Sequence, residues 1–475
     1  MRKAITVSLW LCSLVWVTMA WGGALEDFVK EPDSSYAYAA VDSKPGAGCT
    51  IYTLDMISQT WRPNDVDKPV WKHWVLVAVP DRVETETALL LVSGGNNKHD
   101  SLPKLREKEE MVVNSVAAKT GGVVVVLQGV PSEPLVFKAE GKERTEDEII
   151  AYTYRQYVDT GDGTWPLLLP MVKSAVRAMD STQDFLKKLT PAVNVKDFVV
   201  TGASKRGWTT WLTGAVDPRV VGIAPMVIDV LNMPPQMKHQ KEWYGAYSSE
   251  VQDYTELKLT DYLASPEAQP LLDIVDPYSY REKYTMPKLV LVGSSDQYWT
   301  LDASKFYFHD LPDPKYIHYE ANGDHDTNGE PETIKALTHF YNCVAKKKAM
   351  PEFTWDIQPD GTYLVTPGEP QPTEVRLWKA HAPTLDFRKV TVGDVFTSEV
   401  LTPNADGTYS GRVKAPKEGF DGFYIELVYR SLLGFDYSLT TTTCVPERST
   451  NILGIALAVC LPLLLLGAVG WALFK

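Results

Sequence analysis

A serine in the middle of the chain has the neighbours that a catalytic nucleophile needs. Ser204 lies in the stretch 202–207, GASKRG, which follows an apolar run and precedes a helical-type stretch. A strand, a Gly-x-Ser turn and a helix in this order are typical of a nucleophile elbow, in which small neighbours leave the hydroxyl exposed. The usual spacing is Gly-x-Ser-x-Gly, and here the second glycine, Gly207, comes one position later. A serine that caps a helix N-terminus is the alternative interpretation.

An acid and a base follow the serine in an informative order. A buried-strand pattern ends in a turn that carries Asp296, with Asp302 a little further on as the alternative acid. A later glycine-containing loop presents His325. Serine, acid and histidine in this chain order are typical of α/β-hydrolases. We therefore expect His325 to accept the proton of Ser204 and Asp296 to orient the histidine ring.

Backbone N–H groups near the serine could stabilise an oxyanion. The strand candidate 88–92 runs into the loop 93–97, SGGNN, at the position that supplies one donor in this fold. We expect donors from Gly95 or Asn96 and from the residue after the nucleophile, Lys205. An ordinary Gly-Gly turn is the alternative for this loop.

Tryptophans near these motifs are candidates for a substrate pocket. Trp165, Trp208 and Trp299 lie close to the proposed site in sequence, although core packing explains each of them equally well. No CxxC pattern suggests a metal site, and acyl transfer by a serine needs no cofactor. The expected partner is a small-molecule ester or peptide substrate, with no metal and no cofactor.

The elements around these motifs predict an α/β domain over residues 25–350. Runs of Leu and β-branched residues alternate with helical patterns, as in a doubly wound, mostly parallel sheet. The strand candidates are 74–79, 88–92, 122–128, 197–201, 221–227 and 288–292, and the helix candidates are 104–120 and 167–188. The segments 133–165 and 231–281 interrupt this alternation. We interpret them as insertions that cap the site at the carboxyl ends of the strands.

The pattern of predicted elements changes after residue 350. Short strand candidates separated by Pro-Asp-Gly, Pro-Gly and Ala-Asp-Gly turns predict a small all-β sandwich over 351–440. It has no cluster of catalytic residue types, so we interpret it as a packing or spacer module. A polar linker, 441–451, follows.

Both ends of the chain read as targeting segments. Residues 1–24 have the positive start and apolar run of a signal peptide, with an N-terminal anchor as the alternative. Residues 452–474 carry no charge and are long enough for a transmembrane helix, with a cleaved lipid-anchor signal as the alternative. These features predict a secretory-pathway, single-pass membrane protein with an extracytoplasmic ectodomain.

Charge and cysteine content narrow the partners. The formal net charge of −13 argues against nucleic-acid binding, which needs a basic face. Outside the two terminal segments the cysteines are Cys49, Cys343 and Cys444, so at most one intrachain disulfide is expected.

These motifs resemble those of the PhoPQ-activated pathogenicity-related protein family, which includes the autocrine proliferation repressor proteins. The matching stretches are 71–74, 93–97, 202–212, 293–299 and 322–326. The resemblance implies an α/β-hydrolase domain related to secreted peptidases and esterases, with Ser204, Asp296 and His325 at the matching positions. It implies no settled substrate, and the predicted membrane tail departs from the secreted members.

The residues and the resemblance favour a serine hydrolase that cleaves an ester or peptide bond through an acyl-enzyme. A non-catalytic signalling or binding protein that retains the fold is the alternative from another class, because a fold does not dictate a function. An aminopeptidase of the dipeptidyl type is a further variant. It would need carboxylates for the substrate's free amine, and the run 146–148, EDE, could supply them or could be a solvated face.

Overall fold

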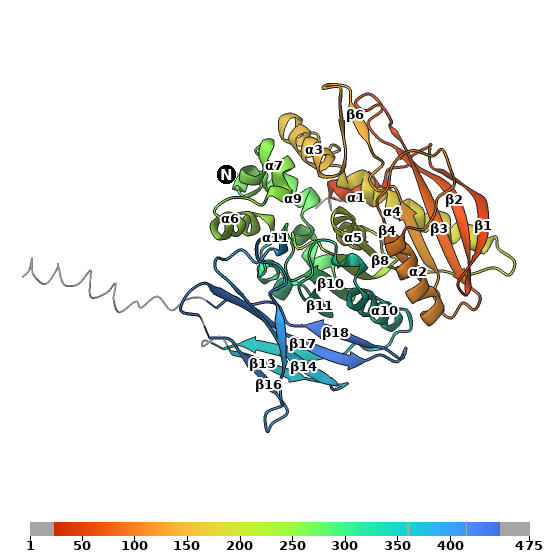
Figure 1. Ribbon diagram of the computed structural model, residues 1–475. Helices are drawn as coiled ribbons and strands as arrows, with labels where there is room; N and C mark the ends of the chain where they lie inside the picture. The colour runs from red at the N-terminus through yellow and green to blue at the C-terminus, as the bar shows by residue number, and fades with distance from the viewer. Residues whose placement is uncertain (1–22, 359–361, 415, 447–475) are drawn as a thin grey trace, which may run out of the picture.

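Nine strands form one sheet at the centre of the protein (Figure 1). The computed structural model describes residues 23–358, 362–414 and 416–446. The strand order is β1-β2-β3-β5-β4-β8-β9-β10-β11. The pairs β1–β2, β2–β3 and β3–β5 are antiparallel, and every pair further along this order is parallel. The bounds are β1 (Ala37–Gly46), β2 (Cys49–Thr60), β3 (Val70–Pro80), β4 (Thr87–Val92), β5 (Val124–Gln128), β8 (Asp197–Ala203), β9 (Val220–Met226), β10 (Lys288–Gly293) and β11 (Lys315–Glu320). The predicted α/β fold with a mostly parallel sheet is confirmed.

Helices cover both faces of this sheet. Because side chains alternate along a strand, Leu90 packs into one apolar core with α4 (Leu168–Lys187) and α5 (Lys205–Val216). Its neighbour Leu89 packs into a second core with α2 (Glu107–Thr120) and α10 (Pro331–Ala345). Both leucines are fully buried, which is why the strand reads as a continuous apolar run. A short first helix, α1 (Ala24–Lys30), packs against α4.

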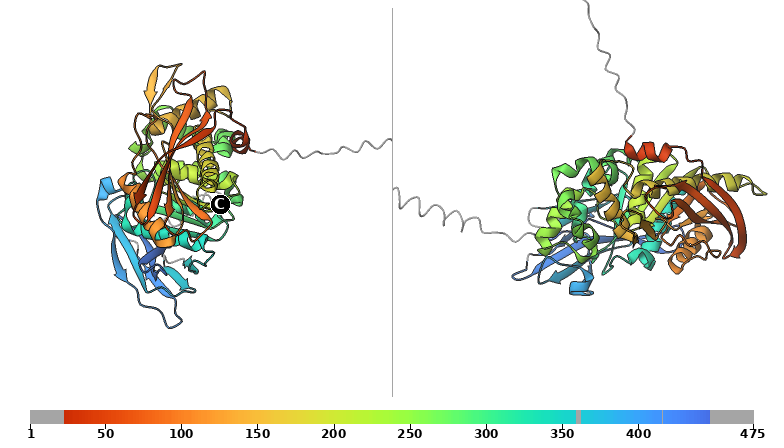
Figure 2. Two further views of the ribbon diagram at one scale, coloured as in Figure 1. Left: turned by 90° about the vertical axis from the view of Figure 1, so that its right-hand side faces the viewer. Right: turned by 90° about the horizontal axis from the view of Figure 1, so that it is seen from above.

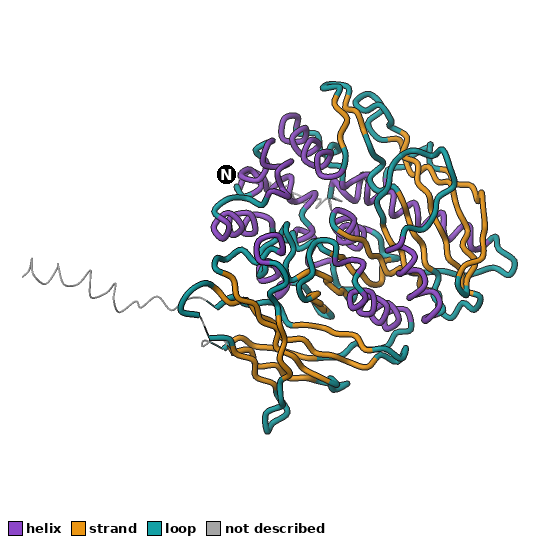
Figure 3. The backbone as a smooth tube through the Cα atoms, in the orientation of Figure 1, coloured by secondary structure: helices purple, strands orange, loops and turns teal. Residues whose placement is uncertain are grey.

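Two segments build a helical cap at one end of the sheet. Figure 3 shows short helices gathered there. Residues 133–165 contain β6 (Leu135–Phe137), β7 (Lys142–Arg144) and α3 (Glu146–Thr160). Residues 231–281 contain α6 (Met233–Tyr244), α7 (Gln252–Glu256), α8 (Leu259–Leu263) and α9 (Gln269–Val275), with 3₁₀ turns between them. Helix α3 contacts α7, α8 and α9, so the two segments form one structure.

Two small antiparallel sheets follow, which we call the β-module. Their strand orders are β12-β13-β16 and β15-β14-β17-β18. The bounds are β12 (Phe353–Ile357), β13 (Thr362–Pro367), β14 (Glu374–Ala382), α11 (Lys389–Val392), β15 (Thr397–Val400), β16 (Tyr409–Arg412), β17 (Phe420–Arg430) and β18 (Asp436–Thr440).

The β-module packs beside β11, at the edge of the main sheet opposite β1 (Figure 2). The Tyr319 N–H of β11 donates to the Thr440 hydroxyl of β18 at 3.3 Å. Strands of the module also contribute side chains to both apolar cores of the α/β domain. The module is therefore packed into the α/β domain along one side.

One part of the predicted fold is corrected. In the part of the chain that the structure describes, no helix is long and apolar enough to cross a membrane. The longest, α4, has 20 residues but carries five charged side chains, Lys173, Arg177, Asp180, Asp184 and Lys187, which forbid a hydrocarbon environment. The predicted transmembrane helix, 452–474, lies outside the described residues, as do residues 1–22 of the predicted signal peptide. The described residues thus form an α/β domain with a β-module, and the transmembrane helix of the predicted fold class is not part of them. Cys49, Cys343 and Cys444 are each free.

Candidate active site

Ser204 sits at a strained turn between β8 and α5. Its φ of 58° and ψ of −128° lie outside the regions that side-chain-bearing residues prefer, as a nucleophile elbow requires. The Ser204 N–H donates to the Met226 carbonyl oxygen of β9 at 2.9 Å, which fixes the turn against the neighbouring strand. Such strain persists only where the surroundings determine it, and it is common at functional sites.

The unusual glycine spacing has a steric reason. A Cβ atom on Gly207 would lie 2.8 Å from the Met226 carbonyl oxygen and 2.9 Å from the Gly202 carbonyl oxygen. A Cβ atom on Gly202 would lie 2.7 Å from the Arg206 carbonyl oxygen. Because these neighbours are backbone atoms, neither position admits a side chain without moving the elbow. The glycine three residues after Ser204 is therefore the one that allows close packing of helix on strand.

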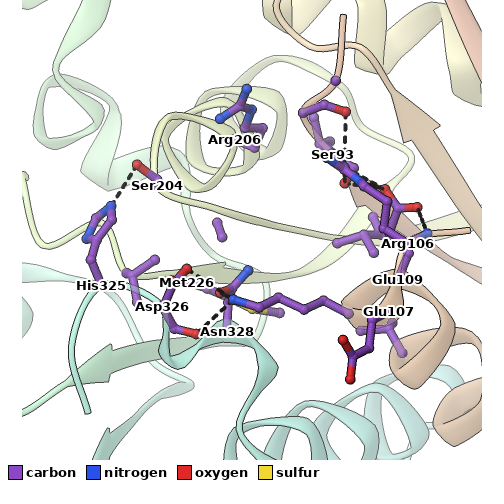
Figure 4. Close-up of a pocket in the computed structure, with 18 of the residues that line it drawn as sticks. Ser93, Arg106, Glu107, Glu109, Ser204, Arg206, Met226, His325, Asp326 and Asn328 are labelled. Atoms are coloured by element: carbon purple, nitrogen blue, oxygen red, sulfur yellow. Dashed lines mark hydrogen bonds and ion pairs between the residues drawn. The ribbon is translucent and has the colours of Figure 1, made fainter. Parts of the chain in front are cut away.

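His325 joins the serine to the predicted acid. Its Nε2 lies 2.8 Å from Ser204 Oγ, and its Nδ1 lies 2.8 Å from Asp296 Oδ2. Figure 4 shows the imidazole pointing at Ser204 across the mouth of a pocket. The other oxygen, Asp296 Oδ1, accepts the Tyr298 N–H at 2.7 Å, so the carboxylate is held on both sides. With the Nδ1 proton donated to Asp296, Nε2 is free to accept the serine proton.

The protonation of His325 reflects two opposing effects. Burial of the ring disfavours the imidazolium and lowers its pKa, but the nearby Asp296 carboxylate favours it. The net effect is a pKa above the usual value for histidine. The ring of Tyr298 lies against the imidazole, with centroids 4.1 Å apart, and limits its rotation. The arrangement suits a base whose charged form is stabilised by the acid.

The alternative acid, Asp302, belongs to a different cluster. Its carboxylate pairs with His239 at 2.8 Å and with Lys305 at 2.6 Å. The structure therefore brings Asp296, and not Asp302, to His325.

Of the predicted oxyanion donors, Gly95 and Lys205 lie with Ser204. Gly95 lines the same pocket as the serine, and its φ of 142° with Gly129 N only 3.1 Å from a built Cβ requires glycine. Lys205 is the first residue of α5, where backbone N–H groups have no intrahelical acceptor. Asn96 lines a neighbouring pocket with Trp74 and His99 and is not among the residues that line the pocket of Ser204.

The predicted tryptophans divide in the same way. Trp208 and Trp299 line an apolar pocket that also contains Ser204 and His325. Trp165 is not part of it: the Arg62 guanidinium stacks 3.7 Å from its ring centre and Phe137 packs beside it. Trp165 lies at the end of the first insertion, and its side chain is buried in the apolar core beneath that insertion. The prediction of a pocket role for Trp165 is corrected accordingly.

A charge cluster next to the nucleophile escaped the sequence analysis. Lys205 Nζ lies 2.5 Å from Glu146 Oε2 and 3.2 Å from Asp147 Oδ2. The Arg206 guanidinium forms two bonds to the Glu146 carboxylate, at 2.7 and 2.9 Å, and its NH2 lies 3.7 Å from Glu133. The opposite charges of GASKRG and the EDE run were the available signal. These pairs attach α3 of the first insertion to the nucleophile helix.

Burial and mutual repulsion split the two glutamates of this cluster. Desolvation and the adjacent Glu146 carboxylate raise the pKa of Glu133 to about 8. Glu146 is itself partly desolvated, but the Arg206 and Lys205 charges outweigh this and hold its pKa well below the usual value. At neutral pH the cluster therefore holds the two cations against Glu146 and Asp147 with Glu133 largely protonated.

Two cavities meet at Ser204. One is an open polar pocket of about 450 Å³, with Ser93 and Arg106 on the side facing Ser204 and His325 (Figure 4). Glu107, Lys108, Glu109 and Asp326 give it mixed charge. The other is the apolar pocket under the cap, of about 50 Å³. Over the described ranges, no group of three or more His, Cys, Asp or Glu side chains is placed to hold a metal ion.

The parallel sheet, the elbow and the hydrogen-bonded serine, histidine and aspartate define the class: the protein has an α/β-hydrolase fold. The chain belongs to the PhoPQ-activated pathogenicity-related protein family, whose model matches residues 25–388. Autocrine proliferation repressor protein A from Dictyostelium discoideum is 35% identical over 444 residues, which is 88% of this chain and 89% of that protein. The family resemblance predicted from the motifs is confirmed.

Solved structures show weaker likeness. Acetyl xylan esterase 1 from a Thermoanaerobacterium species is 16% identical with a TM-score of 0.46, covering 68% of this chain and 91% of that one. An acylaminoacyl peptidase from Pyrococcus horikoshii is 13% identical with a TM-score of 0.39, covering 66% and 50%. Both TM-scores are below 0.5, so the assignment of the fold rests on the sheet order and the elbow.

Proposed function

We propose that the protein is a serine hydrolase that cleaves an ester or peptide bond of a small substrate through an acyl-enzyme, with Ser204, His325 and Asp296 as its catalytic residues. The observation that carries this proposal is the continuous chain of hydrogen bonds from Asp296 through His325 to Ser204, at 2.8 Å each, with the serine on an elbow. A serine that merely capped a helix would need no histidine on its hydroxyl and no carboxylate behind that histidine.

The proposed reaction follows from these contacts. Ser204 Oγ bonds to the substrate carbonyl carbon as its proton passes to His325 Nε2, and Asp296 stabilises the imidazolium. The carbonyl oxygen takes the negative charge and accepts the N–H groups of Gly95 and Lys205, each worth about 3 kcal/mol by the precedent of other serine hydrolases. The bond to the leaving group then breaks as the leaving group takes the proton from His325. Water, deprotonated by the same histidine, releases the acyl group and restores the serine.

The charge cluster argues against the aminopeptidase variant. A free substrate amine would need a carboxylate without a cation of its own. Glu146 already binds Arg206 and Lys205, and Asp147 binds Lys205 at 3.2 Å and accepts the Tyr254 hydroxyl at 3.1 Å. We therefore assign these carboxylates to the attachment of α3.

We further propose that the enzyme acts outside the cytoplasm. The predicted signal peptide at the N-terminus supports this, and membership of the PhoPQ-activated pathogenicity-related family is consistent with it.

Covalent labelling of the full-length protein with a fluorophosphonate tests the proposal. We expect one modified peptide containing Ser204, no label in Ser204→Ala and slow labelling in His325→Ala, because the hydroxyl is unreactive without its base. Ser431→Ala is a matched control, since that buried serine also bonds a histidine, His339 at 3.0 Å, but lies in the β-module. A folded protein that takes no label would instead indicate the non-catalytic signalling or binding protein.

A further inference from the structure

The apolar pocket beside Ser204 is small and lined mainly by hydrocarbon. Its walls come from three sources: Trp208 on the nucleophile helix, Ile228 and Val230 after β9, and Met237 and Leu263 on the cap. Each of these side chains is at most 5% exposed. The pocket shares Ser204 and His325 with the open polar pocket, so a substrate bonded to the serine reaches both.

The lining of the pocket offers no unpaired charge to a charged group. The charged side chains in its lining, apart from His325, are Lys205 and Asp147, and these two pair with each other at 3.2 Å. Burying an ammonium or carboxylate there would cost several kcal/mol, and neutral side chains such as Tyr298 and Trp299 do not compensate this cost as a counter-ion would. The group that enters must therefore be uncharged.

The volume of the pocket limits the size of that group. It holds about 50 Å³. Since a water-sized group needs about 10–15 Å³ by this measure, there is room for about three to five non-hydrogen atoms. Expansion would have to displace buried Trp, Met and Leu side chains of a close-packed wall, which costs about 1–3 kcal/mol.

The other pocket has the properties that a leaving group needs. It is about nine times larger, and it is lined by Arg106, Lys108 and Asn328 as well as by carboxylates. A bulky or polar leaving group fits the larger, polar pocket, which leaves the small apolar pocket to the part of the substrate that stays bonded to Ser204.

We infer that Ser204 accepts a short, uncharged, apolar acyl group of about three to five non-hydrogen atoms, which enters the pocket under the cap, and that the polar pocket takes the leaving group. This inference rests on the proposed hydrolase function and names its substrate class.

Activated esters of p-nitrophenol test it with the full-length protein, because p-nitrophenolate is released as the acyl group bonds to Ser204. We expect kcat/KM for the butyrate to exceed that for the octanoate by at least tenfold. The hemiglutarate has an acyl group as long as the valerate but ends in a carboxylate, and we expect it to be a poorer substrate than the valerate by a similar factor.

Variants of the pocket decide whether its walls set this preference. Met237→Ala and Leu263→Ala should each raise the octanoate-to-butyrate ratio of kcat/KM at least fivefold, because truncation of a lining side chain enlarges the pocket. Met350→Ala is the matched control: Met350 is 6% exposed against 5% for Met237, but it belongs to the core that α10 and the β-module share. It should leave the ratio unchanged.

The outcomes of these experiments distinguish failure of the acyl-group inference from failure of the proposed hydrolase function. Labelling of Ser204 together with a preference for octanoate, or for the hemiglutarate, overturns the inference and leaves the hydrolase standing. So does labelling without hydrolysis of any of these esters, or a ratio that Met350→Ala moves as far as Met237→Ala does. Absence of labelling overturns both.

Discussion

The side-chain amide of Asn322 exchanges two hydrogen bonds with the backbone of Phe396. Asn322 Nδ2 donates to the Phe396 carbonyl oxygen at 3.0 Å, and the Phe396 N–H donates to Asn322 Oδ1 at 2.7 Å. Asn322 begins the loop that presents His325, and Phe396 belongs to the β-module. A second contact joins the β-module to the loop that carries Asp296: the Lys389 N–H donates to the Ser295 carbonyl oxygen at 3.0 Å. The β-module thus holds both loops that face the nucleophile.

We predict that Asn322→Gly slows fluorophosphonate labelling of Ser204 several-fold and lowers the free energy of unfolding by about 1–3 kcal/mol, since two hydrogen bonds worth about 0.5–1.5 kcal/mol each are lost. Glycine tolerates the φ of 58° at this position, so this variant isolates the bonds. Asn322→Ala should cost about 1 kcal/mol more, because it adds backbone strain. Labelling rates and urea unfolding measure the two effects.

Asn404→Ala is the control for the loss of the two hydrogen bonds between Asn322 and Phe396. Its side chain also makes two hydrogen bonds in the β-module, at 2.9 Å each, but in an exposed turn. If Asn404→Ala slows labelling as much as Asn322→Gly, the tie to Phe396 has no particular role in the site.

The pH dependence of labelling should report His325. Below its pKa the imidazole is protonated and cannot accept the serine proton, so the rate rises with pH through that pKa. Although burial lowers the pKa of His325, the Asp296 carboxylate raises it by more, so we expect a midpoint above about 6.5. Asp296→Asn removes the raising charge. It should move the midpoint down and slow labelling by up to about 10⁴-fold, as the loss of the acid does in other triads.

A rate profile measured from pH 5 to 9 checks this prediction. An unchanged midpoint in Asp296→Asn would mean that another group controls the reaction. Asp302→Asn serves as the control, because Asp302 pairs with His239 and Lys305.

The parts of this site that the sequence predicted are those that depend on local pattern. The run 124–128 is apolar at every position except its last because parallel strands are covered on both faces, so such strands are visible without a structure. Ser204 stands out because an elbow needs small neighbours on both sides. His325 and Asp296 follow from the fold, since loops after successive parallel strands meet at one edge of the sheet.

What the sequence could not supply were pairings between distant segments. Gly95 and Asn96 are adjacent and equally plausible donors, and only the structure shows that Gly95 lines the pocket of Ser204 whereas Asn96 does not. Trp165 was misplaced because nearness in sequence says little about which side of an insertion faces the site. The β-module was interpreted as a spacer because its contacts with Ser295 and Asn322 join residues far apart in the chain.

Gly207→Ala should disrupt the elbow. Alanine is the better helix former by up to about 1 kcal/mol, but its Cβ would lie 2.8 to 2.9 Å from two backbone carbonyl oxygens, and such overpacking costs about 1–3 kcal/mol. We expect a net loss of stability and loss of labelling. Gly163→Ala is the matched control, since its nearest atoms would be 3.8 and 3.9 Å away. Thermal unfolding of both variants decides; equal melting temperatures would show that the elbow accommodates a side chain.

Glu133 should make the free energy of unfolding fall as pH rises from about 4.5 to about 8. Its pKa is about 8 in the folded protein against about 4.5 when unfolded, so between these values the folded state holds a proton that the unfolded state has lost. The stability that this proton contributes is fully present below about pH 4.5 and is lost by about pH 8, with a slope of at most about 1.4 kcal/mol per pH unit.

Glu133→Gln removes this dependence of stability on pH. The difference between the unfolding free energies of the two proteins, measured by urea titration from pH 5 to 8, should narrow or change sign as pH rises. A constant difference would contradict the assignment.

Lys205 joins two parts of the site, because its backbone N–H is a proposed oxyanion donor and its ammonium binds Glu146 and Asp147 of the first insertion. Lys205→Met keeps the backbone and the length of the side chain but removes the charge, and it leaves Asp147 without its cation. Breaking a fully buried pair costs about 3–5 kcal/mol. Because the Glu146 side chain is 43% exposed, and Arg206 still neutralises it, we expect about 1–3 kcal/mol here. In a double-mutant cycle with Asp147→Asn, the second substitution should cost less in the Lys205→Met background than alone, by at least about 0.5 kcal/mol.

Lys188→Met, which removes an exposed pair with Asp184, should change stability little. If Lys205→Met costs no more than Lys188→Met, the cluster does not hold α3 to the nucleophile helix. If it does cost more, the ion pairs of Lys205 contribute to holding α3 on the nucleophile helix.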